Sequence, residues 1–382
     1  MRVLILGADG YIGWEACMYF SKLGHDVMGL DSLDKRQWEA WCDVEPLTSH
    51  GLPTFVERAR RWNELPPGPR PISTTVCSLL NYKRLCEALI TFDPECIIHL
   101  AEQPSAPFSM MGHDQAFQTQ ENNVLGTLNL IFAVLRSCPE AHIIKLGTMG
   151  EYGTPNIDIE EGWLTVTHNG RTDRLPFPKD PGSFYHLSKV HDSANLLFAA
   201  KNFKLRVTDL NQGVVYGTGT YPLGHPLATS FHYDDMFGTV LNRFVTQAVL
   251  GVPLTVYGRG HQRRAFLDLR DTMQCLSLAS KAPPNPGEFL VMNQFTESFS
   301  IQALAILVSS VTGANVNFLE NPRTIEKAEH HYNPSNANFK ALGLEPLTLD
   351  EDTITNMLTY IEPLKTRIRA GLIQPRVRWS GV

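Results

Sequence analysis

The sequence predicts an α/β fold, with a doubly wound Rossmann-type parallel sheet and a smaller C-terminal α/β substrate domain. Three observations lead to this prediction. Short apolar runs alternate with amphipathic segments of helical spacing, which is the pattern of βαβ units. A glycine-rich turn joins the first apolar run to the first helical segment. After about residue 213 the alternation loosens, as it does where a second, smaller domain begins.

The predicted strands are short apolar runs of the kind found in buried parallel sheets. They cover residues 3–6, 25–31, 96–100, 142–146 and 205–210. The predicted helices have apolar residues three and four apart, and they cover residues 11–23, 82–91, 117–136, 184–202 and 301–312. Residues 32–75 interrupt the alternation and contain a proline-rich stretch near their end. We interpret them as a partly helical insertion that covers the cofactor or the substrate.

The composition excludes several classes of protein. Apolar residues make up 43% of the 382 residues, charged residues make up 19%, and the formal net charge is −6. A nucleic-acid partner requires a basic excess, which is lacking here. The seven cysteines occur singly without a CxxC pair, so neither a metal site nor a disulfide framework is expected. No signal peptide or long apolar run is present, so we expect a cytoplasmic protein without a membrane partner.

The glycine-rich turn has the sequence GADGYIG over residues 7–13. Gly7 allows a tight turn, Gly10 lets the backbone approach a pyrophosphate, and Gly13 lets the helix pack on the strand. A glycine triplet is a weak signal by itself. Its position between the first predicted strand and the first predicted helix makes it a dinucleotide-binding turn.

Asp31 ends the second predicted strand, 24 residues after Gly7. A carboxylate there accepts hydrogen bonds from an adenosine ribose and repels a 2′-phosphate, which favours NAD over NADP. Arg36 weakens this inference, because a nearby arginine can accommodate that phosphate; alternatively, Asp31 caps a helix or a turn. We expect an NAD-binding Rossmann domain over residues 1–213, with the insertion at about 32–75, and a substrate-binding domain over 214–382 that can interleave with the first.

Tyr185 and Lys189 form a YxxxK pair within a predicted helix. Residues four apart share one helix face, so the phenol and the ammonium can converge. Thr148 follows the strand 142–146, and doubly wound sheets bind ligands at the C-terminal ends of their strands. A close lysine and an oxidised nicotinamide both favour the phenolate of a tyrosine, whose ordinary pKa is about 10. These residues predict oxidation of a substrate alcohol, with Tyr185 as the base and Thr148 holding the hydroxyl.

Several long strings make the sequence resemble the UDP-sulfoquinovose synthase family, which consists of extended short-chain dehydrogenases/reductases. The strings are KLGTMGEYGTPNIDIEEG from Lys145, HNGRTD from His168, FYHLSKVHDS from Phe184, DLNQGVVYG from Asp209 and NQFTE from Asn293. The resemblance runs over nearly the whole chain. It implies an enzyme that uses NAD and acts on UDP-glucose.

The resemblance implies a reaction in three stages. NAD⁺ oxidises the C4 hydroxyl of glucose, aided by Thr148, Tyr185 and Lys189. The ketone acidifies the C5 proton, and loss of this proton and of the C6 hydroxyl gives a 4-keto-5,6-ene. Sulfite adds at C6 and hydride returns to C4, so NAD is not consumed. Glu151 and His186 are candidates for the other acid and base steps; alternatively, Glu151 orients a loop and His186 is a core residue.

The motifs and the resemblance together give two sets of binding residues. The cofactor set is Gly7, Gly10, Tyr11, Ile12, Gly13, Asp31, Arg36, Ser78, Leu79, Leu100, Ala101, Glu102, Asn122, Tyr185, Lys189, Gln212 and Val215. The substrate set is Gln103, Ser105, Thr148, Met149, Gly150, Asn211, Asn242, Thr255, Tyr257, Arg264, Gln294 and Arg323. Arg264 and Arg323 match family positions that clamp a diphosphate, for which the planar guanidinium is suited; either could instead form a surface salt bridge.

The sequence departs from the family at three places. The family string EQRSAPYSM is EQPSAPFSM here, so Pro104 replaces an arginine. The arginine-rich loop before the family's DYD string is replaced by residues 221–232, which contain no lysine or arginine. The aspartate that meets the adenine is Ser78 here. The first two changes reduce positive charge where sulfite or a diphosphate would bind.

Three hypotheses follow from these observations. In the first, the enzyme makes UDP-sulfoquinovose from UDP-glucose and sulfite. In the second, it is a sulfite-independent 5,6-dehydratase that forms an exocyclic alkene on a nucleotide sugar or a nucleoside. In the third, it is a regulatory NAD-binding protein, which the intact Thr148, Tyr185 and Lys189 disfavour. The resemblance also implies a homodimer formed through the helices 117–136 and 184–202, although their apolar faces would equally fit against the sheet.

Overall fold

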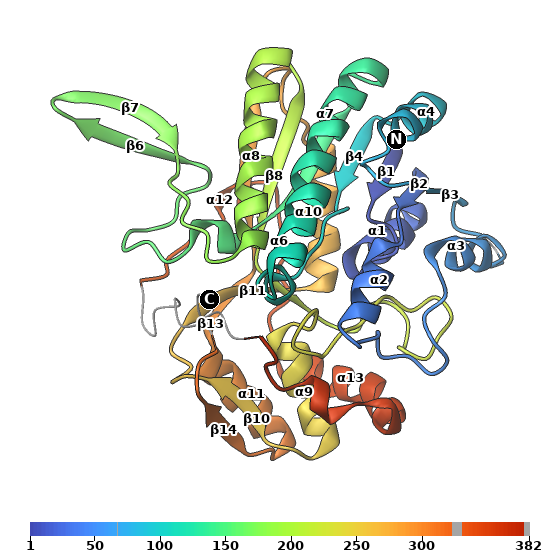
Figure 1. Cartoon of the computed structure of the whole chain (residues 1–382), viewed down its shortest axis with the longest axis vertical. Coiled ribbons are helices and arrows are strands. Elements are labelled where there is room, and N and C mark those ends of the chain that lie inside the picture. The colour runs from blue at the N-terminus through green and yellow to red at the C-terminus, as the bar shows by residue number, and fades with distance from the viewer. Residues whose placement is uncertain (67, 323–330, 378–382) are drawn as a thin grey trace.

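The computed structural model describes residues 1–66, 68–322 and 331–377, and a sheet of seven parallel strands lies at its centre (Figure 1). The strand order is β12-β8-β5-β4-β1-β2-β3. The strands are β1 (Arg2–Leu6), β2 (Asp26–Asp31), β3 (Ile72–Val76), β4 (Cys96–His99), β5 (His142–Thr148), β8 (Arg206–Gln212) and β12 (Phe289–Gln294). The order reverses between β1 and β4, and such a switch point opens a ligand-binding crevice at the C-terminal strand ends.

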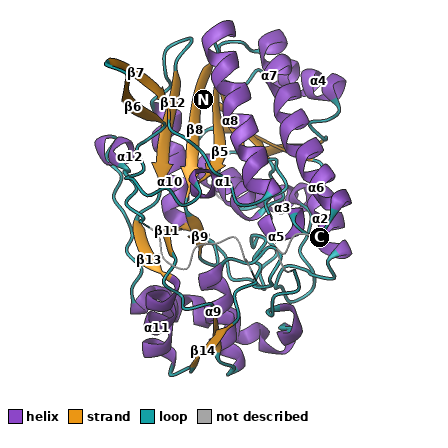
Figure 2. Cartoon of the chain, turned by 60° about the vertical axis from the view of Figure 1, so that its left-hand side comes forward, coloured by secondary structure: helices purple, strands orange, loops and turns teal. Residues whose placement is uncertain are grey.

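Helices cover both faces of this sheet (Figures 1 and 2). One face carries α1 (Tyr11–Lys22), α3 (Phe55–Asn63) and α10 (Leu269–Lys281), and the other carries α4 (Tyr82–Phe92), α7 (Gly126–Ser137) and α8 (Phe184–Phe203). Alternate strand residues face opposite sides, so Val3 and Ile5 join the first core while Leu4 and Leu6 join the second. A strand covered on both faces must be apolar along its length, which explains the uninterrupted runs in the sequence.

A second, smaller lobe has its own hydrophobic core and lies in the lower part of Figure 1. Its helices are α9 (Val240–Leu250), α11 (Ile301–Thr312) and α13 (Glu351–Ile361). Two small sheets accompany them, one of β10 (Leu254–Tyr257) and β14 (Val316–Leu319), the other of β13 (Glu297–Ser300), β11 (Arg263–Asp268) and β9 (Val214–Tyr216). The other helices of the described residues are α2 (Asp34–Trp41), α5 (Ala106–Ser109), α6 (His113–Gln120), α12 (Ala337–Ala341), η1 (Glu121–Leu125), η2 (Met149–Tyr152), η3 (Glu362–Arg367) and η4 (Ala370–Leu372).

The structure confirms the predicted fold class and the predicted strands and helices, with one correction. Residues 32–75 are not an insertion throughout, because their last residues begin the edge strand β3. The strand sequence ISTTV is mostly polar, and only Ile72 is buried, so it lacks the apolar run of the inner strands. The main sheet also includes β12, which lies beyond residue 213 in the sequence. The division of the chain at residue 213 stays a prediction.

One predicted helix contains an unexpected turn. The helix expected over residues 117–136 runs continuously from α6 through η1 into α7, and η1 is a π-helical turn of five residues. A π-turn holds one more residue than an α-turn and occurs most often at functional sites. Asn123 in this turn is fully buried, exchanges hydrogen bonds with the backbone of Gln103, and donates to Ser188 Oγ at 2.8 Å.

A hairpin of β6 (Trp163–His168) and β7 (Arg171–Pro176) extends from the body of the protein (Figure 1). It lies in the sequence between Thr148 and Tyr185. Its turn contains Asn169 and Gly170, both with positive φ, which is the geometry that favours Asn-Gly in tight hairpins.

In the part of the chain that the structure describes, no helix combines the length and the apolarity that a transmembrane segment requires.

Candidate active site

A cavity of about 710 Å³ opens at the C-terminal ends of the central strands. Its wall includes residues at the ends of five of them: Gly7 after β1, Asp31 in β2, Leu100 after β4, Thr148 in β5 and Gln212 in β8. The opposite side is formed by residues of the smaller lobe and of the loop before α9. This is the place where open α/β sheets bind their ligands.

The glycine-rich turn is packed too tightly for side chains. Gly7 has a φ of +86°, and a Cβ there would lie 2.6 Å from the carbonyl oxygen of Leu100. A Cβ on Gly13 would lie 1.9 Å from the carbonyl oxygen of Gly7, so only glycine lets α1 approach β1 this closely. Gly10 is the N-cap of α1 and provides no side-chain cap, so the first N–H groups of the helix face the cavity, where an anion can bind.

Asp31 lies in the cavity wall, as predicted from its position at the end of β2. Its carboxylate accepts hydrogen bonds from the backbone N–H groups of Asp9 (2.9 Å) and Leu33 (2.6 Å). Burial and the nearby Asp9 carboxylate raise the pKa of Asp31 to about 6. The side chain is therefore mostly ionised at neutral pH, in the state that accepts hydrogen bonds from a ribose.

Arg36 is not part of the cavity wall. It binds Asp9 instead, with Nε 2.7 Å from Asp9 Oδ2, and it donates to the carbonyls of Leu52 and Pro53. Its guanidinium is thus already engaged by the Asp9 carboxylate and by two backbone carbonyls. This arrangement favours NAD over NADP.

A second arginine also braces Asp9. Arg58 on α3 is fully buried and donates to Asp9 Oδ1 (2.9 Å), to the Asp9 carbonyl (2.9 Å) and to the carbonyl of Ala228 (3.0 Å). Its guanidinium carbon lies 4.8 Å from the ring centroid of Trp14. The segment 32–75 therefore supports the glycine-rich turn from behind, and it also lines the cavity through Lys35 and Trp38 of α2.

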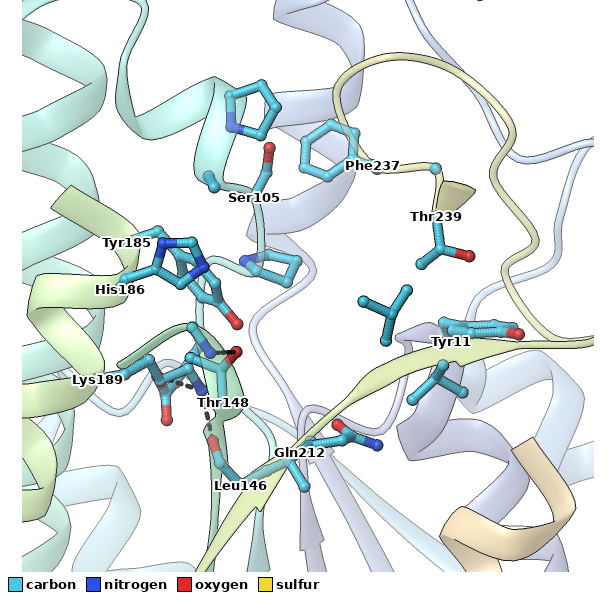
Figure 3. A pocket seen from close by; sticks show the side chains of 18 of the residues that line it. Tyr11, Ser105, Leu146, Thr148, Tyr185, His186, Lys189, Gln212, Phe237 and Thr239 are labelled. Atoms are coloured by element: carbon cyan, nitrogen blue, oxygen red, sulfur yellow. Dashed lines mark hydrogen bonds and ion pairs between the residues drawn. The ribbon is translucent and has the colours of Figure 1, made fainter. Parts of the chain in front are cut away.

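Thr148, Tyr185, His186 and Lys189 lie together on one wall of the cavity, opposite Tyr11 and Thr239 (Figure 3). Tyr185 and Lys189 project from the same face of α8, as their spacing predicts, and Lys189 Nζ is 5.7 Å from the centroid of the Tyr185 ring. Thr148 is the last residue of β5 and the N-cap of η2. Its Oγ accepts a hydrogen bond from the N–H of Gly150 at 3.1 Å.

The ionic contacts of Lys189 differ from the simple lysine–tyrosine pair that the sequence predicts. Lys189 Nζ lies 2.6 Å from Glu102 Oε2 and donates to the carbonyl of Leu146 at 2.6 Å. Burial raises the pKa of Tyr185, and Glu102 raises it further. In this state the tyrosine is a neutral phenol, which is the form that donates a proton.

Glu151 does not line the cavity. It is fully buried, where it accepts hydrogen bonds from Lys145 (3.2 Å), Lys179 and the backbone N–H of Thr148 (3.1 Å). Burial favours the neutral acid, but Lys145 and Lys179 outweigh it and lower the pKa of Glu151 to about 2. The carboxylate is therefore held as an anion that positions Thr148, which matches the alternative role of orienting a loop.

His186 does line the cavity. Its Nδ1 is 2.9 Å from Ser183 Oγ, and its ring centroid is 5.1 Å from that of Tyr185. A Cβ on Gly150 would lie 2.4 Å from His186 Nε2, so the glycine makes room for the imidazole beside Thr148. This placement keeps His186 as the candidate for acid and base steps.

The other expected binding residues divide into two groups. The cavity wall includes Gly10, Tyr11, Ile12, Leu79, Ala101, Glu102, Ser105, Asn122, Met149, Val215, Asn242, Tyr257 and Arg264. The residues that do not line the cavity are Ser78, Gln103, Asn211, Thr255 and Gln294. Most of this second group supports neighbours by hydrogen bonds; for example, Asn211 donates to Tyr152 Oη, and Thr255 Oγ1 accepts from Gln247. Arg323 lies outside the described residues.

Several residues of the cavity wall were not predicted from the sequence. Arg243 on α9 contacts Tyr257 with its guanidinium 4.6 Å from the ring centroid and donates to the Tyr257 hydroxyl at 3.1 Å. Trp38, His232 and Phe237 also line the cavity. Arg243 follows Asn242 directly in the sequence, and this adjacency is the signal that could have revealed it.

Comparison with known proteins adds to this geometry. A family model described as the NAD dependent epimerase/dehydratase family matches residues 3–293. The chain belongs to this family. Within the family, it is 45% identical to the UDP-sulfoquinovose synthase, chloroplastic, of Spinacia oleracea over 100% of this chain and 80% of that protein. It is 39% identical to the UDP-sulfoquinovose synthase of Sulfolobus acidocaldarius over 99% of this chain and 98% of that protein. These similarities confirm the resemblance found in the sequence strings.

A solved structure shows the same fold. The UDP-glucuronic acid 4-epimerase of Bacillus cereus, in complex with UDP-glucuronic acid and NAD, matches with a TM-score of 0.69 at 22% identity, covering 95% of this chain and 100% of that chain. The cofactor of the NAD dependent epimerase/dehydratase family is NAD. The cavity fits this cofactor, because side chains are excluded at Gly7 and Gly13 and a carboxylate stands at Asp31.

Proposed function

We propose that this enzyme is a UDP-sulfoquinovose synthase, which converts UDP-glucose and sulfite to UDP-sulfoquinovose. The observation that carries the proposal is the full-length similarity to two proteins of that name. The cavity supports it, because Thr148, Tyr185 and Lys189 share one wall and an arginine-containing wall lies in the smaller lobe.

The cofactor residues that we propose are those of the glycine-rich turn and Asp31. Gly7, Gly10 and Gly13 would hold the pyrophosphate at the N-terminus of α1, and Asp31 would accept hydrogen bonds from the adenosine ribose. Bound NAD supplies an acceptor for the hydride of a sugar carbinol and later returns it.

The protein's own residues manage the protons of this chemistry. Tyr185 takes the proton of the sugar C4 hydroxyl, and Thr148 holds that hydroxyl by a hydrogen bond. Lys189 supplies a positive charge beneath Tyr185. Glu151 fixes Thr148 through its backbone N–H, and its two lysine partners keep it ionised.

The elimination and addition at C5 and C6 need a further proton carrier. We assign it to His186, which lies beside Tyr185 and against Gly150 in the cavity wall. An imidazole titrates near neutral pH, so it can both take the C5 proton and return a proton to the departing C6 hydroxyl.

One observation favours the second candidate function, a sulfite-independent 5,6-dehydratase. Pro104, which replaces the family's arginine, stands in the cavity wall beside Ser105. Ser105 Oγ donates to the carbonyl of Met236 at 2.5 Å, and Met236 belongs to an apolar cluster with Trp38 and Phe237. Lys35 is a cation in this part of the wall, with Nζ 4.8 Å from the centroid of the Phe237 ring, but it is paired with Glu39, and Pro104 provides no guanidinium for a sulfite anion.

Product mass distinguishes the two functions. The enzyme is incubated with NAD and UDP-glucose, with and without sulfite, and the products are analysed by mass spectrometry. A UDP-sugar that gains sulfonate only in the presence of sulfite supports the synthase. Loss of water alone in both incubations supports the dehydratase, and unchanged UDP-glucose contradicts both the synthase and a dehydratase that acts on UDP-glucose. The Tyr185→Phe variant is the control, and it is expected to form neither product.

We further propose a homodimer formed through α6–α7 and α8. Large apolar side chains are exposed along these helices, although monomeric proteins rarely expose extended apolar patches. They are Phe117, Leu125, Leu128, Phe132, Phe184, Phe198 and Phe203. Light scattering is expected to give twice the chain mass, and Phe198→Lys to give a monomer; a monomeric wild-type protein contradicts the proposal.

The remaining expectations stay proposals. These are the division into an NAD-binding domain over residues 1–213 and a substrate-binding domain over 214–382, and a cytoplasmic location. Limited proteolysis near residue 213 and fractionation of producing cells would test them.

A further inference from the structure

A buried carboxylate holds the lysine of the active site. The side chain of Glu102 is 2% exposed and that of Lys189 is 5% exposed, and their charged atoms are 2.6 Å apart. Lys189 also donates to the carbonyl of Leu146, the residue two before Thr148 in β5. The ammonium is thus fixed at two points, at the end of β5 and at the end of β4.

Glu102 has one cationic partner among the residues that the structure describes. His99 Nε2 is 3.8 Å from Glu102 Oε1, but burial lowers the pKa of His99 to about 4, so its imidazole is neutral. Lys145 lies deeper, where it pairs with Glu151 (3.2 Å) and Asp209 (3.3 Å). Among the described residues, Lys189 is therefore the cation in ion-pair contact with Glu102.

Both charges of the Lys189–Glu102 pair act on the phenol of Tyr185. Its ring centroid is 5.7 Å from Lys189 Nζ, and Glu102 is the largest contributor after burial to the raised pKa of Tyr185. Other titratable groups around the pair and the phenol are His99 on β4, Lys145 on β5, Glu151 in η2, Lys179 before α8, His186 and Asp192 on α8, and Asp209 on β8.

We propose that Glu102 is a positioning residue, which anchors the Lys189 ammonium beneath Tyr185 and whose charge sets the pH at which Tyr185 accepts a proton. This inference rests on the proposed function only in taking Tyr185 as the base. With Glu102 present, Lys189 is fixed, and the two opposite charges offset each other at the phenol. Tyr185 then stays protonated until bound NAD⁺ adds its own positive charge, and it can return the proton when hydride is given back.

The test is the Glu102→Gln variant, which keeps the size of the side chain and removes its charge. Loss of a carboxylate this close is expected to lower the ionisation midpoint of Tyr185 by about one pH unit or more. The midpoint is measured with saturating NAD⁺ from tyrosinate absorbance, as the difference between each protein and its Tyr185→Phe counterpart. The acid limb of kcat/KM is expected to shift in the same direction.

Two further variants separate positioning from a structural effect. Glu102→Gln/Lys189→Met removes both charges of the pair, so its midpoint is expected to return close to that of the wild type. Glu161→Gln removes a half-buried carboxylate that accepts hydrogen bonds from the N–H groups of Asn293 and Asn338, and it is expected to leave the midpoint unchanged.

The outcomes are decisive because the titration uses no sugar. Equal midpoints in the wild type and Glu102→Gln would overturn the proposal, as would an equal shift in Glu161→Gln. If Glu102→Gln does not fold, a double variant whose midpoint differs from that of the wild type by more than about one unit overturns it instead. A correct midpoint shift in an enzyme that leaves UDP-glucose unchanged would refute the proposed function and support this inference.

Discussion

The buried ion pair between Arg58 and Asp9, next to the glycine-rich turn, leads to a prediction for the variant Arg58→Met. The substitution keeps most of the side-chain volume and removes three hydrogen bonds, two to Asp9 and one to the carbonyl of Ala228. Breaking a buried ion pair from one side costs about 3–5 kcal/mol. Asp9 keeps Arg36 at 2.7 Å and the N–H of Phe55 at 2.7 Å, so we expect the lower end, a loss of about 3 kcal/mol.

The assay is urea unfolding followed by circular dichroism, together with NAD titration by calorimetry. Arg61→Met is the matched control on the same helix, because Arg61 forms an exposed pair with Glu57 that is worth at most about 0.5 kcal/mol. Since Asp9 belongs to the turn that would bind the pyrophosphate, Arg58→Met is also expected to weaken NAD binding by about tenfold. If the two variants unfold at the same urea concentration and bind NAD equally, the Arg58–Asp9 ion pair stabilises neither the fold nor the NAD site, and the reasoning is refuted.

Two other predictions concern the turn and the buried acid. Gly13→Ala places a methyl group 1.9 Å from the carbonyl oxygen of Gly7, so calorimetry should detect no NAD binding, whereas Gly371→Ala, with no atom within 4 Å of the new methyl, should bind normally. The pKa of Glu151 is lowered from 4.5 to about 2, so its ionic contacts stabilise the fold above pH 4.5 and are lost as the pH falls towards 2. Glu151→Gln should therefore lower the free energy of unfolding by up to about 3 kcal/mol at pH 6 and by far less near pH 2; an equal loss at both pH values would contradict this assignment.

The sequence was sufficient for features that depend on local spacing. The turn GADGYIG lies between a strand and a helix as predicted, and Tyr185 and Lys189 share a helix face because they are four residues apart. Inner strands were found because a strand covered on both faces must be apolar. The edge strand β3 was missed because its exposed face allows polar residues.

Contacts between distant segments could not be predicted in the same way. Glu102 and Lys189 are 87 positions apart in the sequence, and Arg58 and Asp9 are 49 apart. The first pair forms because α8 packs against β5, which lies beside β4, and the second forms because α1 and α3 share one hydrophobic core. The role of Glu151 was ambiguous for the same reason, since its partner Lys179 is 28 positions away and follows an extended hairpin.

The π-turn η1 determines which side chains of its helix reach the cavity wall. It places Asn122 in the wall and Asn123 in the interior, although they are consecutive residues. A π-turn absorbs one additional residue locally, so the helix keeps the same rotational phase on either side of it. We therefore expect that one residue inserted into a regular helix at this place can add a polar group to the wall while the helix on either side keeps its packing. Conversely, deleting one residue here would restore an ordinary helix and erase that group.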